Sequence, residues 1–279
     1  TCFSKTSFAQ NFWQQLYTPD SIHIYDVIVD DSNYIYLGVS NVPYGAGGVY
    51  RSTDNATTWT RIGLENRSVH SLNIDQAGNL YAGVNCEIFK SVDNGISWVS
   101  KFSITSNVFV IENGFDSIVL AGGRVNFAIM RSGDRGETWN IVHSVNYPGY
   151  TEEWFTDFVF SDNGIIYASS KDPVGVEQGV YISIDLGISW QYFGLPKGVA
   201  SLSFDTEGNL LAGTTAEGLY RYNFNSSIWS LLDNYISVNE IILNQVNSIY
   251  LACGSMPFFN GGAKVSYDNG ETFEYINSG

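Results

Sequence analysis

The chain has 279 residues, of which 44% are hydrophobic, 15% aromatic and only 15% charged, and 28 of them are glycine. This size allows one large domain with a sizeable core, and so much glycine is typical of many short strands joined by tight turns. Acidic residues outnumber basic ones by 28 to 13, and the net charge of −15 argues against nucleic acid or acidic lipid as a partner. Because no apolar run approaches the roughly 18 residues of a membrane span, no membrane insertion is expected.

The first ten residues, TCFSKTSFAQ, resemble the end of a secretory signal peptide. Ser7-Phe8-Ala9 fits the small-x-small cleavage rule and gives a mature start at Gln10, although an ordinary polar tail is the alternative. We therefore expect residues 1–9 to be a signal-peptide remnant and residues 10–279 to form a single domain. The expected location is secreted, periplasmic or at the cell surface.

One eight-residue motif recurs along the chain: serine, any residue, aspartate, any residue, glycine, any residue, serine or threonine, then an aromatic residue. Its full copies are Ser91–Trp98, Ser132–Trp139, Ser183–Trp190 and Ser266–Phe273. Two weaker copies are Ser52–Trp59, with Ala56 in place of glycine, and Tyr222–Trp229, which keeps only the frame and the final tryptophan. The six copies start 39, 41, 51, 39 and 44 residues apart, which indicates an internal repeat.

Four strands are predicted in each repeat. Strand a is mainly apolar and precedes a turn rich in Gly, Asn and Asp; strand b follows, strand c leads into the motif, and strand d leaves through its aromatic residue. Strand a is predicted at Ile24–Val29, Val69–Ile74, Val108–Ile111, Phe155–Phe160, Val199–Phe204 and Val238–Leu243. Strand b is predicted at Leu80–Val84, Ile118–Gly122, Ile165–Ser169, Leu210–Thr214 and Ile249–Cys253.

Repeats of this length, which cannot bury both faces of a sheet alone, are typical of β-propeller blades. The sequence therefore predicts an all-β fold: a β-propeller of four-stranded antiparallel blades, six of them in this chain. Phe12–Leu16 resembles a strand d with no motif before it. Two forms stay open, namely six complete blades with a spare N-terminal strand, and a seven-bladed ring left incomplete.

The motif resembles the Asp-box, also called the bacterial neuraminidase repeat, and the resemblance covers Phe12 to Gly279. It implies a sialidase-like propeller, a fold shared by sialidases, xyloglucan-cleaving glycosidases, receptors and secreted binding propellers. The motif aspartates are expected to be structural, because one carboxylate per turn accepts backbone amides but falls short of a calcium loop. They are Asp54, Asp93, Asp134, Asp185 and Asp268.

The resemblance also implies that ligands meet the face opposite the motifs, which is built from the b–c loops and the d–a links. Exposed aromatic residues beside charged ones on this face would suit stacking on sugar rings or peptide side chains. The alternative is that these aromatics fold back to cap long loops. The candidate ligand-binding residues are Tyr44, Arg124, Tyr147, Tyr150, Glu152, Trp154 and Phe258.

The resemblance is compatible with two enzyme activities, a sialidase and an inverting glycosidase. A sialidase needs three converging arginines, but Arg51, Arg131 and Arg221 all directly precede a motif, which marks them as scaffold. An inverting glycosidase needs two carboxylates, and the acids that it could recruit are Asp157, Asp172, Glu152 and Glu177. Xyloglucan-cleaving relatives, however, are built from two propellers with a cleft between them, and no hydrolytic triad is indicated.

The favoured function is therefore a binding or scaffold propeller that recognises a glycan, a peptide or a protein, with a glycoside hydrolase as the alternative. We expect no bound metal, because the sequence has no ligand cluster with metal-site spacing. We also expect no cofactor, and the chain is expected to be a monomer. Cys86 and Cys253 could form one disulfide, but a small buried thiol is favoured at Cys253, because it aligns with the small residues Gly83, Gly122, Ser169 and Gly213 of the other repeats.

Overall fold

The computed structural model describes Thr18 and residues 22–105, 107–115, 117–123, 128–144, 154–171, 178–234, 237–244, 248–254 and 261–276. These residues form 24 β-strands and no helix. The strands make six four-stranded antiparallel sheets, each from four consecutive strands. The fold is therefore a six-bladed all-β propeller, as the repeat spacing predicted.

Each sheet runs from an inner strand a to an outer strand d. The first three sheets comprise β1 (Ile24–Val29), β2 (Ile35–Val39), β3 (Gly48–Ser52), β4 (Thr60–Gly63), β5 (Val69–Ile74), β6 (Leu80–Val84), β7 (Glu87–Ser91), β8 (Val99–Ser103), β9 (Val108–Asn113), β10 (Val119–Gly123), β11 (Ile129–Ser132) and β12 (Asn140–His143). The last three comprise β13 (Trp154–Phe160), β14 (Ile166–Lys171), β15 (Gly179–Ser183), β16 (Gln191–Gly194), β17 (Val199–Phe204), β18 (Leu210–Thr214), β19 (Leu219–Asn223), β20 (Ile228–Asp233), β21 (Val238–Leu243), β22 (Ile249–Cys253), β23 (Gly262–Ser266) and β24 (Glu274–Tyr275).

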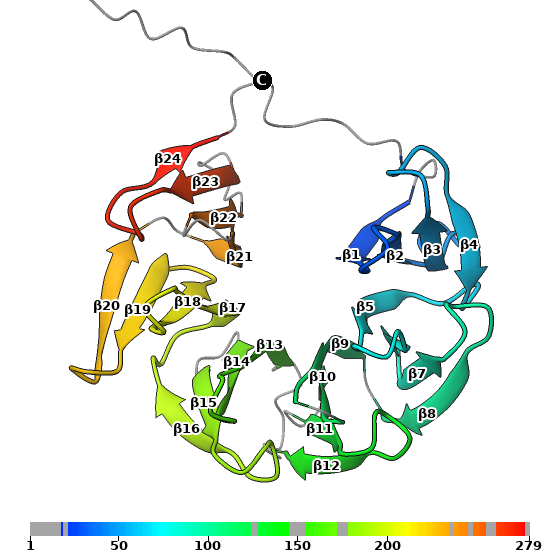
Figure 1. The fold of residues 1–279 in the computed structure, drawn as a ribbon, viewed down its shortest axis with the longest axis horizontal. Coiled ribbons are helices and arrows are strands. Elements are labelled where there is room, and N and C mark those ends of the chain that lie inside the picture. The colour runs from blue at the N-terminus through cyan, green and yellow to red at the C-terminus, as the bar shows by residue number, and fades with distance from the viewer. Residues whose placement is uncertain are drawn as a thin grey trace, which may run out of the picture.

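The six sheets stand around a common axis, with the strands a innermost (Figure 1). Each inner strand contacts the next: β1 with β5, β5 with β9, β9 with β13, β13 with β17, and β17 with β21. No contact of comparable extent joins β21 to β1, and Figure 1 shows an opening between the first sheet and the last. The described strands thus form an open ring.

The core lies in the seams between neighbouring sheets. One cluster joins Tyr36 and Val49 of the first sheet to Val69 and Leu72 of the second, all nearly inaccessible to solvent. Strand b is buried on both faces in β6, β10 and β18, which explains its continuous apolar sequence. Because a sheet buries its faces only against its neighbours, stability depends on the seams.

The eight-residue motif forms the turn between strands c and d. In the second copy, the Asp93 carboxylate accepts hydrogen bonds from the Ser91 hydroxyl at 2.7 Å and the Ser97 amide at 2.9 Å. Gly95 takes a φ of +84°, and a Cβ there would lie 2.3 Å from Ile62 of the preceding sheet. The Trp98 indole donates to the Gly95 carbonyl at 3.1 Å. These hydrogen bonds connect the start of the turn with its end.

The predicted strands largely coincide with the observed ones, but one alignment was wrong. The sequence alignment places Cys253 at the strand b position that holds the small residues Gly83 and Gly213 in other sheets. The pairing puts Ala252 there, because Ala252 pairs with Glu240 as Gly83 pairs with Ser71. Cys253 is buried and free, and Cys86 is exposed and free, so the two thiols do not pair. Phe12–Leu16 lies outside the described residues.

Candidate functional site

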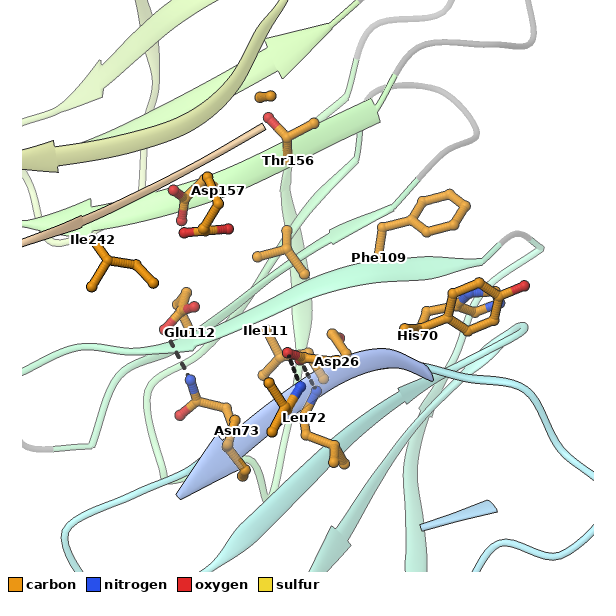
Figure 2. Close-up of a pocket in the computed structure, with 17 residues that line it drawn as sticks. Asp26, His70, Leu72, Asn73, Phe109, Ile111, Glu112, Thr156, Asp157 and Ile242 are labelled. Atoms are coloured by element: carbon orange, nitrogen blue, oxygen red, sulfur yellow. Dashed lines mark hydrogen bonds between the residues drawn. The ribbon is translucent and has the colours of Figure 1, made fainter. Parts of the chain in front are cut away.

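A pocket of 460 Å³ lies on the ring axis, lined by residues of the inner strands (Figure 2). All of its lining residues belong to a strand a, four from each of the first three sheets and one or two from each of the last three. A second hollow of 560 Å³ shares Tyr25, His70, Phe109, Thr156 and Glu240 with it. The two together form one axial cavity with its mouth at the start of the inner strands.

The mouth of this cavity opens away from the eight-residue motifs. Strand a runs parallel to strand c, because both pair antiparallel with strand b. The motif follows the end of strand c, so the end of strand a lies on the motif face and its start on the opposite face. Tyr25, His70 and Phe109 are each the second residue of their strand a, and they therefore lie at the face opposite the motifs.

Three aromatic rings from adjacent sheets form an arc at this mouth. The Tyr25 and His70 rings are 4.7 Å apart between centroids and tilted by 31°, and His70 meets Phe109 edge-on at 5.1 Å. Burial lowers the pKa of His70, against a raising hydrogen bond with Asn85, so the ring is neutral at pH 7. Its Nε2 atom is buried without a hydrogen-bond partner among the described residues. The arc presents ring edges and faces to a ligand.

Four carboxylates lie deeper in the cavity: Asp26, Glu112, Asp157 and Glu240. Figure 2 shows Asp26, Glu112 and Asp157 on strands from different sheets around the same space. Glu112 accepts a hydrogen bond of 2.8 Å from the Asn73 side chain. The axis thus concentrates carboxyl groups, and among the described residues the one lysine or arginine side chain lining the cavity is Lys171, at the mouth.

Burial raises the pKa of each of these carboxyl groups. For Asp157 it is raised to about 7, although the Leu202 and Phe158 amides lower it. For Glu112 burial raises the pKa well above its usual range, and the charges of Asp157 and Asp26 add to the effect. The same cause raises the pKa of Asp26 and Glu240. The cluster therefore holds protons that isolated carboxylates would lose.

Two of these acids also join neighbouring sheets. Asp26 accepts a hydrogen bond of 2.7 Å from the Leu72 amide of the next sheet, and Asp157 accepts one of 2.7 Å from the Leu202 amide. Their carboxylates are thus already engaged in the scaffold. Polar groups nearer the mouth include Asn107, Lys171 and Asn239, and burial lowers the pKa of Lys171.

The sequence missed most of these residues. The hydrophobic pattern predicts that strand a is mainly apolar, whereas its second and third residues line the axial cavity in several sheets. The available signal was the acid inside an apolar run, as in IYDVIV, FTDFVF and VNEIIL. Asp157 alone had been considered, as a carboxylate for hydrolysis.

Of the predicted ligand-binding residues, only Tyr44 has a described side chain. It is 86% exposed in the loop between β2 and β3 and does not line the axial cavity. The backbone of Trp154 begins β13, but its side chain is outside the described part. Also outside the described residues are Arg124, Tyr147, Tyr150, Glu152 and Phe258.

The basic residues before the motifs do have a structural role. Each reaches the motif of the next sheet and donates to the carbonyl of the residue after its aspartate: Arg51 to Asn94 at 3.0 Å and Lys90 to Arg135 at 2.7 Å. Arg131 does the same to Leu186, and Arg221 to Asn269. These arginines lie on the motif face, as their register predicted. They are therefore unavailable for a carboxylate grip at the axial mouth.

Within the described ranges, no group of three or more acidic, histidine or cysteine residues is arranged to hold a metal ion. The same part of the chain contains no helix able to cross a membrane.

Several solved structures resemble this chain in fold. No protein-family model and no curated protein sequence matches it. The extracellular domain of a protein described as a one-component system from B. thetaiotaomicron matches 94% of this chain with a TM-score of 0.72 and 12% identity. The match covers 34% of that protein's chain, so the present chain spans about a third of it.

Two further structures widen the range of functions on this fold. YCF48 bound to D1 peptide has a TM-score of 0.68 and 16% identity over 94% of this chain and 84% of its own. An ancestral GH74 enzyme has a TM-score of 0.69 and 17% identity over 90% of this chain and 38% of its own. At such identities the likeness shows a β-propeller and nothing finer.

Proposed function

We propose that this chain is a binding propeller that takes a glycan, peptide or protein ligand at the axial mouth opposite the eight-residue motifs. The observation that carries the proposal is the arc of Tyr25, His70 and Phe109 above a cavity of several hundred Å³. Aromatic arcs of this kind bind through ring faces and edges while polar groups fix orientation. Asn107 and Asn239 supply such polar groups.

The loops around the same mouth extend the proposed site. The order of the strands in the sequence repeat assigns to this face the link that carries Tyr147, Tyr150 and Glu152 and the b–c loops that carry Arg124 and Phe258, which lie outside the described residues. Trp154, at the start of β13, belongs to it as well. In our proposal these residues enlarge the arc into a recognition surface, with Tyr44 at its edge. YCF48, a propeller solved with a peptide, supports a peptide among the ligand classes.

The turn motifs belong to the same proposal. Their geometry supports the Asp-box relation suggested by the sequence, with Asp54, Asp93, Asp134, Asp185 and Asp268 as structural residues. We further propose that residues 1–9 are a signal-peptide remnant, that residues 10–279 are one domain, and that the protein works as a secreted or envelope-associated monomer. The extracellular setting of a structural neighbour supports this location.

Arrays of immobilised glycans and peptides test the proposal. We expect a subset to bind the wild-type chain, and His70→Ala or Phe109→Ala to weaken that binding about two- to tenfold each, since a buried ring contact contributes about 0.5–1.5 kcal/mol. Trp154→Ala and Tyr150→Ala are expected to weaken it too. Ile96→Ala is the matched control, because Ile96 is exposed on the motif face. Equal loss in Ile96→Ala, or release of sialic acid or reducing sugar, would argue against a binding propeller.

A glycoside hydrolase is the second candidate, and one observation favours it. Asp157, which burial gives a pKa of about 7, has the protonation state required of a general acid at neutral pH. Glu112, Asp26 and Glu240 are further carboxylates at the same cavity. Hydrolysis of oligosaccharides by the purified chain, abolished by Asp157→Asn in a folded variant, would establish this alternative.

A further inference from the structure

The first sheet exposes the positions that the other five sheets bury. Ile24, the first residue of β1, is 40% exposed, and Val27, the fourth, is 56% exposed. The residues that align with Ile24 in the other inner strands are fully buried: Val69, Val108, Phe155, Val199 and Val238. The residues that align with Val27 are at most 4% exposed: Leu72, Ile111, Phe158, Leu202 and Ile241.

The last sheet is open on the opposite face. The fourth residue of strand b is small and buried in the first five sheets, because the next sheet's backbone rests on it. A Cβ at Gly83 would lie 2.9 Å from the Val108 carbonyl, and one at Gly213 2.9 Å from the Val238 carbonyl. Ala252 holds this position in β22 and is exposed. The two open faces are thus the two halves of a seam that occurs five times within the ring.

An amide hydrogen bond joins the inner strands at three of the five seams. Asp26 accepts from the Leu72 amide at 2.7 Å, Asp157 from the Leu202 amide at 2.7 Å, and Ser201 from the Ile241 amide at 3.3 Å. Each acceptor pairs with the small residue of strand b, and Glu240 holds the same position in the last sheet. Glu240 accepts from the Ser201 hydroxyl at 3.4 Å, and no described sheet follows it with a backbone amide.

Tight contacts at the seams limit the angle between neighbouring sheets. In four of the five seams the backbone of one sheet packs against a glycine of the previous one, namely Gly38, Gly83, Gly122 and Gly213. With the observed angles the sixth sheet does not reach the first, and Figure 1 shows an opening between them. Direct closure would change the packing at these contacts.

We propose that this opening is the docking site of one further four-stranded sheet of the same repeat, linked in tandem like the other six. Its strand a covers Ala252 and donates an amide to Glu240. Its strand b places a small residue against Ile24 and covers Val27. The ring in the working protein then has seven sheets and no exposed seam.

A copy of the chain's own second sheet is the probe. We fuse a copy of residues 66–103 after Gly279 and compare the extended chain with the six-sheet chain. Both carry Cys2→Ser, Cys86→Ser and Cys253→Ala, with the cysteine of the fused copy also replaced by serine, and a single reporter thiol from Val27→Cys. Val92→Cys is the matched control, because Val92 is 70% exposed in a motif away from the opening. The rate of thiol labelling is measured at several protein concentrations.

In the six-sheet chain we expect Val27→Cys to react about as fast as Val92→Cys. In the extended chain its labelling should slow about tenfold or more, with the control unchanged and the thermal midpoint raised. Unchanged labelling in the extended chain overturns the proposal, and so does a lower thermal midpoint or a failure to fold, because a sheet that fits adds buried surface. Protection already present in the six-sheet chain overturns it too: concentration-independent protection means direct closure, and concentration-dependent protection means head-to-tail copies.

Discussion

The motif aspartates stabilise their turns because they are held ionised. Hydrogen bonds from the Ser97 side chain and amide and from Ser91 lower the pKa of Asp93 to about 2. Equivalent partners give Asp54, Asp134, Asp185 and Asp268 the same value. The five carboxylates thus act alike in five sheets.

Acid should therefore weaken the turns. A carboxylate whose pKa is depressed in the fold contributes stability above its ordinary value of 3.8, and that stability is lost as the pH falls toward 2. We expect Asp93→Asn to lower the thermal midpoint at pH 6, and the difference from wild type to shrink below pH 4 and disappear near pH 2. A difference that stays constant down to pH 2 would contradict the ionised staple.

At the residue scale, the turn hydrogen bonds could be predicted from the sequence and the axial aromatic arc could not. The staple at Asp93 was predictable because all its partners lie within eight residues. The arc of Tyr25, His70 and Phe109 was not predictable, because the three rings come from three different sheets, about 40 residues apart in sequence. Local hydrogen bonding is visible in a short pattern, whereas convergence on an axis depends on the rotation from sheet to sheet.

At the scale of the element, strand b determines how closely two sheets approach. Gly122 and Gly123 are neighbours in β10, yet only Gly122 lies against the next sheet. A Cβ at Gly122 would be 2.8 Å from the Cβ of Phe155, whereas one at Gly123 would have no neighbour nearer than 3.5 Å. The two positions form a natural pair for testing the seam.

Gly122→Ala should lower the free energy of unfolding by about 1–3 kcal/mol, as expected for overpacking a tight contact. Gly123→Ala should change it by less than about 1 kcal/mol, because the added methyl group meets only ordinary contacts. Chemical denaturation of both variants gives the comparison. Equal effects at the two positions would show that strand b glycines are not seam contacts.

Strand boundaries were predictable from hydrophobic patterning, but the register was less so. β5, β6, β17 and β18 begin and end as predicted, while β10 and β14 begin one residue later. The error that exchanged Ala252 and Cys253 has the same origin, because both residues are small and only pairing with β21 distinguishes them. A one-residue slip moves a side chain to the other face of the sheet.

At the scale of the molecule, the axial carboxyl groups and the motif aspartates change the stability in opposite directions as the pH rises. A carboxyl group whose pKa is raised in the fold costs stability once the unfolded chain ionises it. For Asp157 stability therefore falls as the pH rises from 3.8 to about 7. Glu112, Asp26 and Glu240 have the same sign.

The thermal midpoint should consequently rise as the pH is lowered from 8 to about 5, and fall below about 4 as the motif aspartates take up protons. Differential scanning calorimetry across this range measures it. Stability that increases steadily from pH 4 to pH 8 would show that the axial carboxylates are ionised in the fold.

The central claim is that ligands bind at the axial mouth and not at the motifs. Hydrogen–deuterium exchange of the chain with and without the best array ligand tests it most directly. We predict slower exchange at the starts of the inner strands, around His70 and Phe109, with the turns at Ser91–Trp98 and its siblings unchanged. Protection confined to those turns would contradict the assignment of the ligand face.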